Sequence, residues 1–283
     1  MLRTHYRTYL ENGASPRHAA PLANELQARG LSEEGELLRA FSLHGAGTYS
    51  FRSATLPGGE AFVGARPPIA SPGAWWMDSC DLSLNILLAP YVDPGDWEVM
   101  TEEARQRAKR SLTWFAVRPV AVYQYLTFLE VAPIEYAPGK SSVQEMFDVA
   151  SAGGISPITS LTVHAASLYL YWYGKTFSSD EDWMSIGQTL DIAPWSSVPR
   201  EWSGESGFNS AYAVAISANT FRTDPADTED EQDPDKRMLF GESEARSDTT
   251  FRPVVRLAYG LRLSSTPSSC DEAGRRVLRS YPR

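Results

Sequence analysis

The sequence is poor in the residues that most often build covalent or metal centres. It contains two cysteines and four histidines among 283 residues. Cys80 and Cys270 lie far apart in the sequence and form no CxxC pair. The histidines are too scattered to place two metal ligands on one face of a helix. We therefore expect reduced, non-catalytic thiols, no metal site and no bound cofactor.

Long hydrophobic runs are missing as well. No stretch of about 18 apolar residues, the length that spans a bilayer, occurs. The first residues, MLRTHYRTYLENG, have no apolar core of the kind found in secretory signals. A net charge of −9 argues against a nucleic-acid-binding surface. We expect a cytoplasmic protein that binds neither membranes nor nucleic acids.

The sequence does contain enough apolar residues for a core, at 42% of the chain. Residues 1–46 have leucines at helical spacing, with Gly30 as a break and Gly45 near the end. Ser32 is placed to cap the second helix of this region. Short amphipathic helices cannot form a core alone, so we expect them to dock on the main body or on a partner.

From about residue 48 the apolar segments become short and are separated by Gly and Pro. We expect strands in ATLPGGEAFVG (a hairpin at Gly58-Gly59), LSLNILLAPYV, WFAVRP and FRPVVRL, and helices from Val122 and over Leu161–Tyr173. TEEARQRAKR is either a short helix or an extended surface segment. This mixture of helices and strands predicts the α+β class.

An acidic stretch interrupts the C-terminal half. Residues 224–235 carry seven carboxylates and no base. Such a composition is typical of a solvated loop. A calcium loop is the alternative, although the segment lacks the glycine that an EF-hand loop needs for its turn.

Five segments resemble, in order, motifs of the formylglycine-generating-enzyme family, also called the sulfatase-modifying-factor family. PGGEAFVG is similar to the family's PGGxFxMG. PVAVYQYLTFL is similar to PVTNxxYxxFL, and LTVHAASLYLYWYGKTFSSDEDW to VSWxDAxxYCxWLGKRLPTEAEWE. PREWSGE and FRPVVRL are similar to the family's NVWEWTSD and GFRxVR. The departures are Ala121-Val122 for Thr-Asn, Ala165 for an acidic residue and Ser178 for proline.

The resemblance covers roughly residues 50–260 and implies a large variant of the C-type lectin fold. On this basis we divide the chain into an N-terminal helical appendage (1–46), a formylglycine-generating-enzyme-like domain (47–263) and a C-terminal tail (264–283). The acidic loop, taken as residues 224–247, lies inside the domain.

The sequence lacks the residues that members of this family use for catalysis. Its oxygenases use C-terminal cysteines that bind copper, and this sequence has no cysteine between Gly204 and Arg262. A second branch binds non-haem iron through N-terminal histidines, and His5 and His18 form no such set. The resemblance therefore implies a non-catalytic member, with no catalytic residues. The alternatives are a metal-dependent enzyme that uses carboxylates in the same pocket, or a structural subunit of a larger complex.

Some family relatives use the irregular C-terminal surface for recognition. The corresponding segment here is SGESGFNSAYAVAISANTFR, which combines aromatic area with adaptable polar groups. We predict a protein-binding surface made of Arg200, Phe208, Asn209, Tyr212 and Arg222. The competing interpretation is that Tyr212, Val214 and Ile216 alternate because they form a core strand. The predicted function is a binding or scaffolding module for a protein partner, for example in a bacterial defence or signalling assembly.

Overall fold

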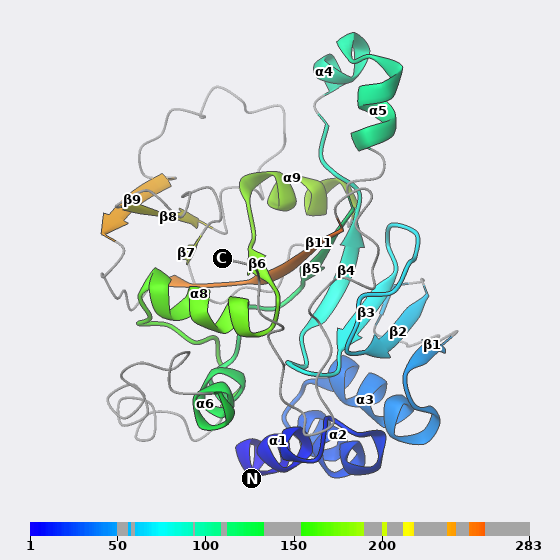
Figure 1. The fold of residues 1–283 in the computed structure, drawn as a ribbon, viewed down its shortest axis with the longest axis vertical. Coiled ribbons are helices and arrows are strands. Elements are labelled where there is room, and N and C mark those ends of the chain that lie inside the picture. Colours follow the sequence, from blue (N-terminus) through cyan, green and yellow to red (C-terminus); the bar gives the residue numbers. More distant parts are fainter. Residues whose placement is uncertain are drawn as a thin grey trace, which may run out of the picture.

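The structure is a computed structural model. It describes residues 1–49, 56–57, 60–92, 94–108, 112–132, 154–189, 200–202, 212–217, 237–241 and 249–257. Helices and two β-sheets are combined in one chain, which confirms the α+β class (Figure 1). None of the helices in the described ranges has the length and apolar character needed to cross a membrane.

The N-terminal helices lie at one end of the main sheet (Figure 1). They are α1 (Leu2–Glu11), the 3-10 helix η1 (Pro16–His18), α2 (Ala19–Ala28) and α3 (Ser32–His44). Their buried leucines and aromatics belong to the same hydrophobic cluster as the sheet, which confirms that they dock on the main body. The capping prediction was wrong: Leu31, buried in that cluster, is the N-cap of α3, and Ser32 is its first residue.

Seven strands form the main sheet, in the order β1-β2-β3-β4-β5-β11-β6. Neighbouring strands are antiparallel except β2 and β3, which run parallel. The strands are β1 (Gly47–Tyr49), β2 (Ala61–Gly64), β3 (Trp75–Asp78), β4 (Leu84–Leu88), β5 (Leu112–Ala116), β6 (Thr176–Phe177) and β11 (Pro253–Leu257). The expected strands in LSLNILLAPYV and FRPVVRL are β4 and β11. Gly58-Gly59, where we expected a hairpin turn, lies outside the described residues.

Both faces of this sheet are buried. Successive side chains of a strand point to opposite faces, and Trp75 and Trp76 accordingly belong to different hydrophobic clusters. Trp76 meets Trp114 edge-on at a ring-centroid distance of 5.6 Å on one face. Phe115 meets Trp183 at 5.4 Å on the other.

Three more ten-residue helices lie in the described part of the chain. They are α6 (Val122–Val131), α8 (Val163–Trp172) and α9 (Asp180–Thr189). Thr162 caps α8 through its side chain, which accepts a hydrogen bond from the Ala165 N–H. Gly174 ends the segment with φ +63°, which confirms the expected left-handed position. Ser179 caps α9 through its hydroxyl oxygen, which accepts from the Asp182 N–H, and the Ser179 N–H donates to Asp182 Oδ2.

The connection between β4 and β5 forms α4 (Pro94–Val99) and α5 (Glu102–Ala108), which stand clear of the body (Figure 1). The helix α5 shows that TEEARQRAKR contains a short helix, the first of the two structures that the sequence left open. A second, four-stranded sheet has the order β10-β7-β8-β9. Its strands are β7 (Arg200–Trp202), β8 (Tyr212–Ser217), β9 (Arg237–Gly241) and β10 (Thr249–Thr250).

Candidate functional site

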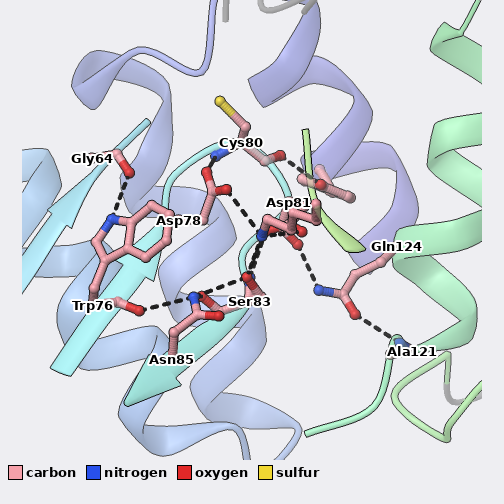
Figure 2. Close-up of polar contacts among 11 residues, drawn as sticks. Gly64, Trp76, Asp78, Cys80, Asp81, Ser83, Asn85, Ala121 and Gln124 are labelled. Atoms are coloured by element: carbon pink, nitrogen blue, oxygen red, sulfur yellow. Dashed lines mark hydrogen bonds and ion pairs between the residues drawn. The ribbon is translucent and has the colours of Figure 1, made fainter. Parts of the chain in front are cut away.

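A group of buried charged side chains surrounds the turn between β3 and β4. The sequence of this turn favours local hydrogen bonding, because aspartate side chains readily bond to backbone N–H groups two residues ahead. Asp78 Oδ1 accepts from the Cys80 N–H at 2.9 Å. Asp81 Oδ1 accepts from the Ser83 N–H at 3.0 Å and from its hydroxyl at 2.8 Å (Figure 2). Leu82, which lies between Asp81 and Ser83, has φ +59°. This left-handed conformation costs free energy for a residue with a Cβ atom.

Lys175 reaches this turn from the connection between α8 and β6. It follows Gly174, the residue that ends the α8 segment, and its Nζ lies 3.0 Å from Asp78 Oδ2, 2.5 Å from Asp81 Oδ2 and 2.7 Å from Ser83 Oγ. The lysine side chain is 1% exposed and both aspartate side chains are 0% exposed. We name Asp78, Asp81, Ser83 and Lys175 the buried ion cluster.

Two amides extend the cluster to neighbouring elements. Asn85 Nδ2 donates to the carbonyl oxygens of Ser83, at 2.8 Å, and Trp76, at 3.1 Å. Gln124 Nε2 donates to the Asp81 carbonyl at 2.5 Å, while its Oε1 accepts from the Ala121 N–H at 2.7 Å (Figure 2). The second bond satisfies an N–H group at the start of α6 that has no partner within the helix. The turn is thereby tied to α6.

Two tyrosines of α1 hold the same turn. Tyr6 donates its hydroxyl to the Cys80 carbonyl at 2.7 Å, and Tyr9 donates to the Ser79 carbonyl at 2.8 Å. Burial raises the pKa of both phenols above the ordinary value of about 10. They remain protonated, and so remain donors, at every pH at which the protein would ordinarily be studied.

The buried ion cluster is built to be stable rather than reactive. An ammonium group has three hydrogens to donate, and Lys175 has three acceptors within 3.0 Å. Solvent and substrates have no access to side chains that are 0–1% exposed. What the arrangement does chemically is to neutralise charge inside the core and to hold distant segments together.

Cys80 corrects one expectation from the sequence. Its side chain is disulfide-bonded and 0% exposed, so it is not the reduced thiol that we predicted. Cys270, the other cysteine of the chain, lies outside the described residues.

The described ranges contain no group of three or more His, Cys, Asp or Glu side chains placed to hold a metal ion. Of the five residues predicted to bind a partner, Arg200 lies in β7 and Tyr212 in β8. Phe208, Asn209 and Arg222 lie outside the described residues. The stretch Tyr212–Ser217 is a strand, as the competing interpretation of this segment required.

The pairing of β7 with β8 shows that Arg200 and Tyr212 lie far apart in the second sheet. Arg200 pairs with Ser217, at the opposite end of β8 from Tyr212. At about 3.3 Å per residue, their backbones are roughly 17 Å apart along the strand. A surface that includes both must extend along the second sheet.

Sequence reasoning missed the buried ion cluster. One signal was present: Asp78, Asp81 and Ser83 interrupt the apolar run WWMDSCDLSLN, which otherwise has the composition of buried strands. Carboxylates at such positions need partners. Nothing local in the sequence identified Lys175, which is 94 residues from Asp81, as that partner.

Comparison with known proteins gave no match, either to a family model or to a curated protein.

Proposed function

We propose that this chain is a non-catalytic module with a formylglycine-generating-enzyme-like variant of the C-type lectin fold, and that it binds a protein partner. The segment from Trp202 to Arg222, which includes strand β8 (Tyr212–Ser217), would provide the contact surface together with Arg200. Assembly with a partner protein, as a scaffold in a defence or signalling complex, is the role that such a module would serve.

The proposal rests on one observation: the buried side chains that could take part in catalysis are already engaged in contacts within the core. The amine of Lys175 is saturated by two carboxylates and a hydroxyl, and none of these groups is open to solvent. Cys80 is engaged in a disulfide. Groups that could otherwise act as nucleophile, base or ligand thus support the fold, which favours recognition over catalysis.

The packing of the N-terminal helices favours the second sheet over residues 1–46 as the recognition surface. α1 packs on α6, and α3 packs on β2 and β3. Arg118 joins α3 to the body through Glu34 Oε1 at 2.9 Å and Glu33 at 3.5 Å. These helices therefore use their apolar faces and several of their charges within the chain.

A double substitution tests the assignment. Co-purification from the native host identifies the partner, and its affinity is then measured for the purified wild-type chain and for the variant Phe208→Ala/Arg222→Ala. If these residues anchor the interface, affinity should fall by at least about 2 kcal/mol, roughly 30-fold in Kd. We expect both side chains to be exposed, and exposed substitutions rarely change stability by more than about 0.5 kcal/mol, so the variant should fold normally.

The matched control replaces an aromatic residue and an arginine on other exposed surfaces. Tyr171, on α8, is 45% exposed, and Arg17, in η1, is also exposed. The variant Arg17→Ala/Tyr171→Ala should bind the partner like the wild type. Equal binding by the Phe208→Ala/Arg222→Ala protein would remove the Trp202–Arg222 segment from the interface.

A further inference from the structure

The disulfide at Cys80 starts from the turn between β3 and β4. The Cys80 N–H donates to Asp78 Oδ1, and its carbonyl accepts from Tyr6, so the backbone at this position is fixed. The side chain belongs to the hydrophobic cluster that includes residues of α6 and α8, and its sulfur points away from Asp81 (Figure 2). Because this side chain is 0% exposed, a cysteine of another molecule could reach the sulfur only if the core opened. We therefore expect the partner in the disulfide within the same chain.

The chain offers one such partner. It contains two cysteines, so a disulfide that joins Cys80 to another part of the same chain must end at Cys270. Cys270 lies outside the described residues, and the length of chain after the last described strand decides whether it can reach the turn. That strand, β11, ends at Leu257, 13 positions before Cys270.

The register of the main sheet shows how far the chain must travel. Leu257 pairs with Leu112, at the start of β5. The Val117 N–H, just beyond the end of β5, donates to the Leu84 carbonyl, at the end of the sheet where the turn between β3 and β4 lies. Five residue steps along β5 correspond to about 17 Å and two strand spacings to about 10 Å, which gives a separation of roughly 20 Å. Thirteen extended residues span up to about 43 Å, so the chain after β11 is long enough to return to the turn.

We propose that Cys80 and Cys270 form a disulfide within the chain, and that this bond straps the segment after β11 to the turn between β3 and β4. The loop that it closes contains the strands from β4 to β11 and the Trp202–Arg222 segment. A disulfide across a long loop stabilises a fold mainly by restricting the unfolded chain. The strap goes beyond the proposed function and does not depend on it, because it holds whether or not the chain binds a partner.

The strap makes the stability of the fold depend on the redox state of the solution. When the bond forms, each thiol loses a proton and the two electrons pass to a disulfide oxidant such as oxidised glutathione, which becomes two thiols. Reduction reverses this exchange and needs a thiolate to approach one of the sulfurs. Since the Cys80 side chain is 0% exposed, reduction should be slow in the folded protein and fast once urea has opened it.

Mass spectrometry tests the pairing. The full chain is refolded in a mixture of reduced and oxidised glutathione, unfolded again without reductant and treated with N-ethylmaleimide. We expect no maleimide adduct, a mass about 2 Da below that of the reduced chain, and, after proteolysis, a linked pair of peptides that contains Cys80 and Cys270. Free thiols at both positions, a glutathione adduct on either cysteine, or a disulfide-linked dimer would overturn the pairing.

Thermal unfolding tests whether the bond acts as a strap. Wild-type chain that has been reduced in urea and refolded with a phosphine reductant should melt at least about 4 °C below the oxidised chain. The control is Cys270→Ser, which leaves Cys80 and the contacts of the turn in place. This variant should melt like the reduced wild type, and the reductant should not change its melting temperature. Equal melting of the oxidised and reduced wild type, or a reductant effect of the same size in Cys270→Ser, would overturn the strap.

Discussion

Replacing Lys175 with methionine should test the buried ion cluster most directly. Methionine keeps much of the apolar stem of lysine and removes the ammonium group that lies within 3.0 Å of Asp78 and Asp81. Two carboxylates that are 0% exposed then lose the cation between them. Breaking a buried ion pair by removing one partner costs about 3–5 kcal/mol. For a chain of this size, that corresponds to a fall in melting temperature of about 6–20 °C.

Urea unfolding of the wild type and the variant measures this loss. Glu11→Gln is the control: its pair with Arg7 is 3.8 Å long and both side chains are about half exposed, so it should change stability by less than about 0.5 kcal/mol. A loss below about 1 kcal/mol for Lys175→Met would contradict the reasoning.

Three other substitutions test separate parts of the fold. Burial raises the pKa of Glu34 despite the nearby Arg118. The contribution of this carboxyl group to stability is therefore most favourable at low pH and is lost as pH rises through the raised pKa. The urea midpoint of the wild type, relative to that of Glu34→Gln, should increase on acidification. A Cβ atom at Gly35 would lie 2.3 Å from Gln27 Cγ, so Gly35→Ala should lower the free energy of unfolding by about 1–3 kcal/mol, as measured by thermal unfolding. The control is Gly47→Ala, which should change stability little because a Cβ atom there meets nothing within 4 Å. Trp172 is 4% exposed, and Trp172→Ala should cost about 3–5 kcal/mol; a loss below about 1 kcal/mol would mean that its packing is unimportant.

The helices and central strands could be predicted because their apolar residues repeat at the spacing of the element. The α8 segment ends at Gly174, and β4 and β11 lie in the apolar runs that indicated strands. Ser32 was wrongly expected to be the N-cap of α3: it is the first residue of the helix, and Leu31, which is buried in the core, holds the N-cap position.

The candidate sites were harder to predict, for two physical reasons. Ion pairing between Asp81 and Lys175 joins residues 94 positions apart, and no local pattern specifies such a partner. The recognition surface was chosen by composition, which identifies residue types suited to an interface but not their arrangement. The register of the second sheet places Arg200 and Tyr212 at opposite ends of β8, an arrangement that only strand pairing determines.

The turn between β3 and β4 brings these contacts together at one point in the molecule. The helix α1 holds it through Tyr6 and Tyr9, α6 through Gln124, and the end of the α8 segment through Lys175. A left-handed Leu82 costs on the order of 1–2 kcal/mol, and a buried ion pair adds little net stability relative to apolar packing. We therefore infer that the cluster fixes the relative positions of these elements more than it adds to the free energy of unfolding. Because none of these contacts involves the described strands of the second sheet, substitutions there can alter recognition without disturbing the turn that organises the core.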